Sequence, residues 1–224
     1  MPKDESSEDR NDLDEETDAE RRETIEPLDI EELRTEPAFE RIARAVTELC
    51  DVSMAHVSIM ENETQCVVGQ VGFERDHFAR DQSFCAYTLA SRELMVVEDA
   101  KRDERFRENP YVTEAPHIRF YAGFPLEVQQ IPVGTICAID DEPGTLSERC
   151  RASLTELARL TEQFLETKLV ATSENDPRHR VAAELTSMFG LTAILDGRAG
   201  PGSPVGDLVG ELKACTEAAQ AAVN

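Results

Sequence analysis

Two amphipathic segments enclose a run of short strand-like segments, and this arrangement limits the folds open to the chain. From Thr35 to Cys50, apolar residues recur at the spacing of a helix that Thr35 can cap. From Ser147 to about Ala171, leucines and alanines form the apolar stripe of a second, longer helix. The segments between them that read as strands are His56–Met60, Gln65–Val71, Leu94–Val97, Ile118–Val128 and Val133–Ile139. Hairpin-connected strands with helices at both ends predict an α+β fold on a central antiparallel sheet.

Acidic residues dominate the charge of the chain. The formal net charge is −23 and the isoelectric point is about 4.5. Nucleic acids and anionic membranes are bound through basic patches, so this charge argues against both as direct partners. An acidic, lysine-poor surface is typical of proteins from molar salt, where charge repulsion is screened, and it predicts a halophilic source such as a haloarchaeon. The alternative is an acidic tail on a mesophilic protein.

The two ends of the chain differ in composition from its centre. Residues 1–34 are rich in acids and serine, which predicts a largely disordered tail with one short helical turn at Leu28–Leu33. Residues 35–172 hold the predicted domain, and residues 173–224 are predicted to form a linker and a helical tail. No apolar run is long enough to span a bilayer, and the first residues lack the apolar core of a secretion signal, so we expect a cytoplasmic protein.

Five motifs between the two amphipathic segments resemble those of a GAF domain. They follow one another in the order and at the spacing of that family: RDQSFCAYTL (Arg80–Leu89), VVEDA (Val96–Ala100), RFRENPYVT (Arg105–Thr113), PHIRFYAGFPL (Pro116–Leu126) and VGTICAID (Val133–Asp140). The resemblance implies that the first and last helices pack on one face of the sheet. It also implies a pocket on the other face, covered by segments between Phe73 and His117. GAF domains bind cyclic nucleotides, bilins, haem or small acids, so the family alone names no cofactor.

A strand near this implied pocket carries two candidate ligand-binding residues. Alternation along Ile118–Ala122 places Arg119 and Tyr121 on one face, where they could bind a carboxylate or a phosphate. The alternative is a structural ion pair between Arg119 and Asp99 or Asp103. The sequence leaves both interpretations open.

The short helix that begins at Ser83 supplies further candidates. Its N-terminus could bind an anion; alternatively, Ser83 caps the helix while Phe84 and Cys85 pack inward. His117 resembles a histidine that touches the tetrapyrrole in bilin-binding relatives, but no cysteine stands beside it, and a loop histidine is the alternative. Cys137, in the last strand, is the thiol to test together with Cys85 for redox chemistry.

The cysteines predict neither a metal site nor an enzyme. None of the six forms a CxxC pair or a zinc-like spacing, and His56 and His77 are isolated in the sequence. In a cytosolic protein we expect reduced thiols packed as small apolar residues. Cys85 falls near one cysteine of the free methionine-R-sulfoxide reductases, a branch of the GAF family, but counterparts of the other two are missing. With no other catalytic motif present, we predict no catalytic residues and no enzyme.

These observations predict a sensory module that binds an unidentified small ligand. Its terminal helices would pass the signal to a partner such as a histidine kinase or a transcription regulator, and would form a homodimer. The first alternative is a scaffold without a pocket, in which Phe84, Phe120 and Tyr121 fill the site. The second alternative is a thiol enzyme that resembles the free methionine-R-sulfoxide reductases.

Overall fold

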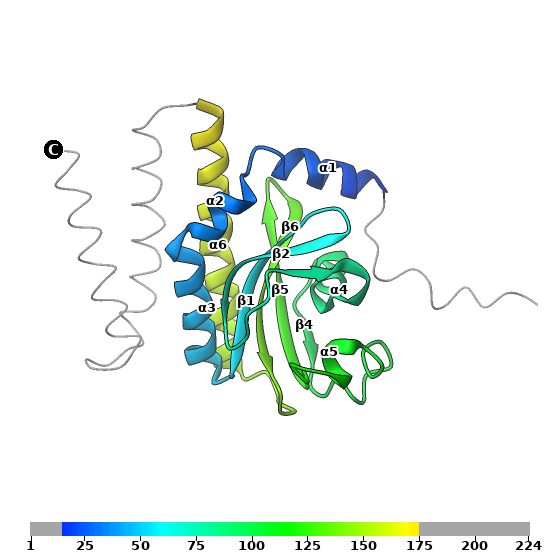
Figure 1. The fold of residues 1–224 in the computed structure, drawn as a ribbon. Helices are drawn as coiled ribbons and strands as arrows, with labels where there is room; N and C mark the ends of the chain where they lie inside the picture. Colours follow the sequence, from blue (N-terminus) through cyan, green and yellow to red (C-terminus); the bar gives the residue numbers. More distant parts are fainter. Residues whose placement is uncertain (1–14, 175–224) are drawn as a thin grey trace, which may run out of the picture.

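A six-stranded antiparallel sheet forms the centre of the computed structural model, which describes residues 15–174 (Figure 1). The strands lie side by side in the order β3-β2-β1-β6-β5-β4. Their bounds are β1 Met54–Met60, β2 Thr64–Val71, β3 His77–Ala79, β4 Met95–Val97, β5 Phe120–Val128 and β6 Ile131–Asp140. The predicted α+β fold is confirmed. The sequence did not predict β3, because three residues are too few to show an alternating pattern.

Two long helices cover one face of this sheet. Helices α3 (Pro37–Cys50) and α6 (Glu148–Glu174) pack against each other there, as the GAF resemblance implies (Figure 1). Between helices and sheet lies the larger apolar core, in which the rings of Phe39 and Phe164 meet edge to face with centroids 5.3 Å apart. A Cβ at Gly69 would overlap the backbone of Phe39, so a glycine is needed where β2 approaches α3.

The opposite face of the sheet carries a second, smaller apolar core. It is covered by α4 (Phe84–Ser91), with α5 (Pro110–Thr113) beside it (Figure 1). Successive strand residues point to opposite faces, so neighbours in β1 and β6 enter different cores. The sheet therefore has one face toward the paired helices and one face toward α4.

The start of α3 differs from the sequence prediction. Thr35 was expected to cap this helix, but it is the last residue of α2 (Ile30–Thr35), and its hydroxyl donates to the carbonyl of Glu32. Glu36 is the residue before α3 and gives no side-chain cap, while Pro37 occupies the first helical turn. Glu36 instead forms an ion pair with Lys168 of α6, which holds the two helices together.

The predicted disorder of residues 1–34 does not hold for Glu15 onward. Helix α1 (Glu15–Ile25) and helix α2 are formed, because both have partners outside their own segment. The side chain of Arg21 is fully buried and donates to the carbonyl oxygens of Met60 and Glu61. Apolar residues of this segment also join the larger core: Ile25, Leu28 and Leu33. Composition alone did not reveal these contacts with distant residues.

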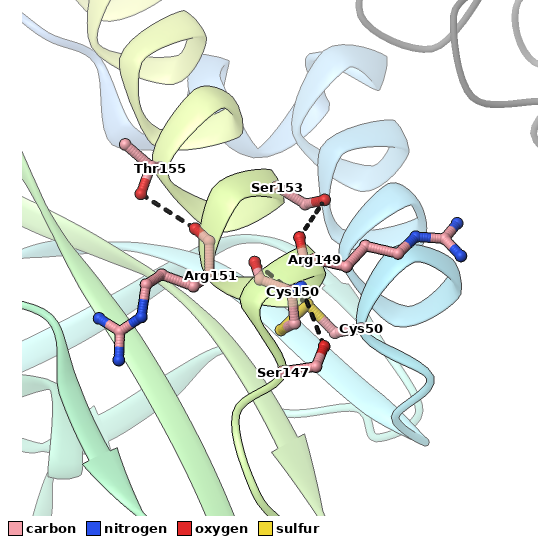
Figure 2. The surroundings of a disulfide bond; sticks show 7 residues. All are labelled: Cys50, Ser147, Arg149, Cys150, Arg151, Ser153 and Thr155. Atoms are coloured by element: carbon pink, nitrogen blue, oxygen red, sulfur yellow. Dashed lines mark hydrogen bonds between the residues drawn. A yellow bond between two sulfur atoms is a disulfide. The ribbon is translucent and has the colours of Figure 1, made fainter.

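A disulfide joins the last residue of α3, Cys50, to Cys150 in the first turn of α6 (Figure 2). This corrects the prediction that all cysteines are reduced. The two residues are 100 positions apart, and only the packing of the terminal helices brings them together. Ser147 lies directly before α6 and caps it as predicted, since its hydroxyl accepts a hydrogen bond from the backbone N–H of Cys150 at 3.1 Å (Figure 2). Among the described residues, Cys66, Cys85 and Cys137 are buried thiols.

Within residues 15–174, none of the helices combines the length and apolar character needed to cross a bilayer. The predicted tail of residues 173–224 lies outside the described residues, apart from the last two residues of α6. The division of the chain at residues 34 and 172 stays a prediction.

Candidate functional site

Helix α4 closes the face of the sheet opposite α3 and α6. Ser83 caps it as predicted, its hydroxyl accepting a hydrogen bond from the backbone N–H of Ala86 at 3.2 Å. Phe84 and Cys85 point inward and are buried. The ring of Phe84 stacks on that of Phe106 with centroids 3.9 Å apart. The helix N-terminus is therefore occupied by its own cap and apolar side chains, and no free anion site results.

Three buried side chains from different elements meet beneath α4. His56 of β1, Cys85 of α4 and Cys137 of β6 form what we call the thiol–imidazole cluster. The Nε2 atom of His56 lies 3.2 Å from the Sγ atom of Cys85, and that sulfur lies 3.9 Å from the Sγ atom of Cys137. His56 and Cys137 are direct cross-strand partners in the sheet, which fixes their proximity.

Tyr121 of β5 completes the lining of the cluster. Its hydroxyl lies 3.4 Å from the Sγ of Cys85 and 2.8 Å from the hydroxyl of Thr88 in α4. A Cβ at Gly123 would collide with this hydroxyl, so the glycine lets the tyrosine lie along the strand. Tyr121 thus ties the sheet to α4 beside the sulfur.

A buried hydrogen-bond network holds the imidazole in place. The side-chain amide of Gln65 donates to His56 Nε2 at 3.0 Å and to the Ser58 hydroxyl at 2.9 Å, and its oxygen accepts from Ser83. These contacts assign the amide orientation and with it the histidine tautomer. In this tautomer Nε2 carries the lone pair that accepts from Gln65, and it lies 3.2 Å from the Sγ of Cys85.

The surroundings give the two thiols of the cluster opposite acidities. Burial raises the pKa of Cys85, but the hydrogen bond with Cys137 and the attraction and hydrogen bond of a protonated His56 imidazole outweigh it, so the pKa is well below that of a free thiol. Burial and the neighbouring Cys85 sulfur raise the pKa of Cys137. Burial and the same sulfur also raise the pKa of Tyr121. Cys85 is therefore the sulfur that ionises first.

The space left at this site is small. The cavity lined by His56, Cys85 and Tyr121 has a volume of about 20 Å³. Pockets for organic ligands measure roughly 300–1,000 Å³, whereas one water needs about 10–15 Å³. In this conformation the site has room for a group of atomic size. Phe84 and Tyr121 fill it as the scaffold alternative expected, but Phe120 does not, because it lies in the larger core on the other face.

Two of the predicted ligand-binding residues form a separate ion pair. Arg119 donates from Nε and Nη2 to the two carboxylate oxygens of Asp99, at 2.8 and 2.9 Å. This geometry matches the alternative interpretation of Arg119, a structural ion pair, and its partner is Asp99. Asp103 pairs with Arg105 instead. The pair lines an open depression of about 750 Å³ that does not include the thiol–imidazole cluster. The guanidinium of Arg119 is therefore already bonded to the carboxylate of Asp99.

Loss of this ion pair is expected to raise the pKa of Asp99. The hydrogen bonds from Arg119 hold that pKa below its ordinary value, so Arg119→Gln should return it toward the value of an isolated aspartate. An NMR titration of the Asp99 carboxyl carbon measures the shift. Arg105→Gln is the matched control, since it removes the partner of Asp103 and should leave Asp99 unchanged. An unchanged Asp99 titration in Arg119→Gln would contradict the assignment.

His117 lies outside the site. It is exposed and has a positive φ of 61°, in the turn that leads into β5. The structure therefore matches the loop-histidine alternative. Of the eight predicted site residues, it brings together Ser83, Phe84, Cys85, Tyr121 and Cys137 and places Asp99, Arg119 and His117 elsewhere.

The sequence prediction missed His56 and Gln65 and dismissed His56 as isolated. A signal was present, because β1 and β6 are almost wholly buried strands, and each carries two polar or thiol residues that stand two positions apart. Alternation places His56 and Ser58 on the face that carries Thr135 and Cys137. Polar residues in register on a buried face indicate a polar site.

An antiparallel sheet with paired terminal helices on one face and a covered site on the other defines a class of small sensory α+β domains. Residues 34–165, more than half of the chain, match the model of the GAF domain. The chain therefore belongs to the GAF domain family, a family of sensory and signalling modules.

Solved structures agree on the fold. The GAF domain of PixJ from Thermosynechococcus elongatus, in its blue-light absorbing form, has a TM-score of 0.52 at 16% identity, and the match covers 66% of this chain and 94% of that one. The type II free methionine-R-sulfoxide reductase from Thermoplasma acidophilum has a TM-score of 0.51 at 14% identity, covering 63% and 95%. At these identities the likeness concerns the fold alone.

A cyclic di-GMP phosphodiesterase of Pseudomonas aeruginosa is 38% identical over 138 residues, which is 61% of this chain. The chain spans about a quarter of that relative's length, since the match covers 24% of it. This finding contradicts the prediction that the chain is not an enzyme. That prediction is wrong as stated, because the matched relative has an enzyme's name.

Proposed function

We propose that this chain is a sensory module that registers a signal at the thiol–imidazole cluster and passes it to a partner through α3 and α6. The observation that carries the proposal is that β1 and β6 each place one side chain in the cluster and the next one in the core beneath the helices. His56 and Cys137 belong to the cluster, while their chain neighbours Val57 and Ile136 pack in the core under the helices. Both residue pairs are in direct cross-strand register.

This arrangement couples the cluster to the helices over a short path. A change in the separation of β1 and β6 at the cluster also moves Val57 and Ile136, because each is joined through the backbone to a residue of the cluster. Close-packed cores respond to such shifts by repacking rather than by continuous deformation. The disulfide and the Lys168–Glu36 ion pair fix α3 to α6, so the two helices respond together.

The proposed partner is a signalling protein, either a histidine kinase, a transcription regulator or an enzyme like the cyclic di-GMP phosphodiesterase that resembles this chain. We place it and this chain in the cytoplasm, with α3 and α6 extending a homodimer interface. Light scattering in molar KCl tests the dimer, and a monomeric mass would remove that part of the proposal.

Hydrogen–deuterium exchange tests the transmission itself. Tyr121→Phe removes the hydroxyl that joins the sheet to α4, and we expect faster exchange in α3 and α6 as well as around the cluster. Tyr87→Phe, on the same helix but outside the cluster, is the matched control. Changes confined to α4 and the adjoining strands would refute transmission to the helices.

The small cavity supports a second candidate function, that of an interaction scaffold. A site with about 20 Å³ of space takes no organic ligand without opening. Mass spectrometry of small molecules released from the denatured protein distinguishes a sensor that binds an organic ligand from an interaction scaffold. A stoichiometric organic metabolite would require that the site opens, and its absence together with an unchanged exchange pattern in Tyr121→Phe would favour the scaffold.

The net charge of −23 favours a halophilic source, and we include this origin in the proposal. Repulsion among the acids is screened in molar salt, because the Debye length falls to about 3 Å at 1 M. We therefore expect the melting temperature to rise from about 0.1 M to about 3 M KCl. Thermal melts followed by circular dichroism measure this, and equal stability at both concentrations would contradict a halophilic origin.

A further inference from the structure

We propose that His56, Cys85 and Cys137 bind one thiophilic metal ion, Zn²⁺ or Cu⁺, and that this ion is the signal of the sensory module. The inference deepens the proposed function, and only the role of the ion as a signal rests on that function. The site itself stands on the geometry of three buried side chains.

The spacing of the three donor atoms suits a single ion. In a tetrahedral zinc site the metal lies about 2.3 Å from sulfur and about 2.0–2.1 Å from nitrogen, which separates two sulfurs by about 3.8 Å and a sulfur from a nitrogen by about 3.6 Å. Here the two sulfurs are 3.9 Å apart, and Cys85 Sγ is 3.2 Å from His56 Nε2. All three donor atoms lie within 4.8 Å of one another. Small side-chain rotations would centre an ion between them.

The protonation of the cluster also suits a metal. The Nε2 lone pair of His56 accepts from Gln65 here, and an ion would take over this lone pair while the Gln65 amide keeps its hydrogen bond to the Ser58 hydroxyl. Each thiol releases its proton when it binds a metal ion. Two thiolates and Zn²⁺ give a neutral centre, which avoids placing a net charge in an apolar interior. A buried position of this kind ordinarily holds an apolar side chain. Two thiolate sulfurs and an imidazole nitrogen are instead the donors that suit Zn²⁺ and Cu⁺.

The surroundings exclude competing occupants. A volume of about 20 Å³ excludes organic ligands in this conformation, and the absence of carboxylates from the lining disfavours Mg²⁺ and Ca²⁺. The Tyr121 hydroxyl, 3.4 Å from Cys85 Sγ, lies beside the fourth position of a Zn²⁺ ion, which one water can fill. Cu⁺ needs no fourth ligand.

Binding would act on the sheet and on α4 at once. Two of the ligands are cross-strand partners in β1 and β6, and the third lies on α4. An ion would replace hydrogen bonds between these elements with coordination bonds. This couples metal occupancy to the strand separation on which the proposed transmission depends.

Metal titration of the full-length protein under anaerobic conditions tests the site. One equivalent of Zn²⁺ should bind in competition with a chromophoric chelator, and Cu⁺ is titrated in the same way against a Cu⁺ chelator to decide between the two ions. Cys85→Ser and Cys137→Ser should each bind at least about 100-fold more weakly, since even outer-shell residues change metal affinity by 10–100-fold. Cys66→Ser is the matched control, because Cys66 is a buried thiol that bonds to Glu61 outside the cluster.

Cobalt binding to the unaltered protein and to Cys66→Ser keeps the test decisive if the other variants fail to fold. Co²⁺ in the cluster should give thiolate charge-transfer absorption of an intensity that corresponds to two sulfurs. Absence of this absorption together with no Zn²⁺ or Cu⁺ binding would overturn the proposal, as would unchanged affinity in folded Cys85→Ser and Cys137→Ser. Exchange in α3 and α6, measured with and without Zn²⁺, is read separately: binding without a change refutes transmission while the site stands.

Discussion

Reduction of the Cys50–Cys150 disulfide is expected to lower the free energy of unfolding by about 4–5 kcal/mol. The bond closes a loop between residues 100 positions apart, and its main effect is to restrict the unfolded chain. Domains of this size are stable by only about 5–15 kcal/mol, so the loss is a large share of the total. The folded state should persist, because α3 and α6 also share an extensive apolar core.

Urea denaturation with and without a phosphine reductant measures this loss. Cys50→Ser/Cys150→Ser should match the reduced protein and should no longer respond to the reductant. Cys66→Ser, which retains the disulfide, should respond as fully as the unaltered protein. Coinciding denaturation midpoints for the oxidised and reduced protein would show that the bond contributes no stability.

The expected dependence on reduction bears on where the protein works. Disulfides persist in oxidising compartments and are rare in the cytosol, where they are usually transient or redox-sensing. This one lies at the junction of the two helices that we propose as the output of the module. A protein that keeps its fold but changes helix mobility on reduction would suit a cytosolic location.

The architecture could be predicted from the sequence because it follows from local patterns. Runs of mostly apolar residues in β5 and β6 and helical spacing in α3 and α6 leave a signal within each segment. The position of Ser83 before α4 was equally readable, since a cap acts within three residues. The family motifs then fixed which helices share a face.

The missed features all depend on residues that are distant in the sequence. Cys50 and Cys150, or His56 and Cys85, become neighbours only when the sheet and its helices are assembled. Spacing rules for disulfides and zinc sites cannot detect such pairs. Arg119 shows the same limit, since its sequence context was equally compatible with a ligand and with Asp99. The charge composition of the N-terminal segment pointed to disorder, although α1 bonds to distant residues through Arg21 and Asp18 and buries Ile25.

Neutralising Asp18 is expected to release α1 from the domain. Asp18 pairs with two arginines, the fully buried Arg21 and the largely buried Arg80, and bonds Arg80 at 2.7 and 3.1 Å. Asp18→Asn would leave both guanidinium groups without their shared carboxylate. Removal of one partner from a buried ion pair costs about 3–5 kcal/mol, and partial exposure of Asp18 places this case near about 3 kcal/mol.

The same carboxylate makes the attachment of α1 depend on pH. Burial raises the pKa of Asp18, but the hydrogen bonds and charges of Arg80 and Arg21 outweigh it and lower the pKa below its ordinary value. A carboxyl whose pKa is lowered by folding stabilises above its unfolded pKa of about 3.9, and this stabilisation is lost as the pH falls through the lower folded value. Acid should therefore weaken α1 in the unaltered protein, and Asp18→Asn should remove this part of the pH dependence.

Hydrogen–deuterium exchange in α1, together with urea denaturation, separates local release from global unfolding. Glu40→Gln is the matched control, because the Glu40–Arg44 pair is exposed and its loss should cost less than about 0.5 kcal/mol. If α1 stays protected in Asp18→Asn, the apolar contacts of Ile25 and Leu28 must hold the helix without the ion pairs. If it is released, Arg21 and Arg80 are what convert an acidic, apolar-poor segment into an ordered helix, and electrostatics rather than burial of apolar surface sets the edge of this domain.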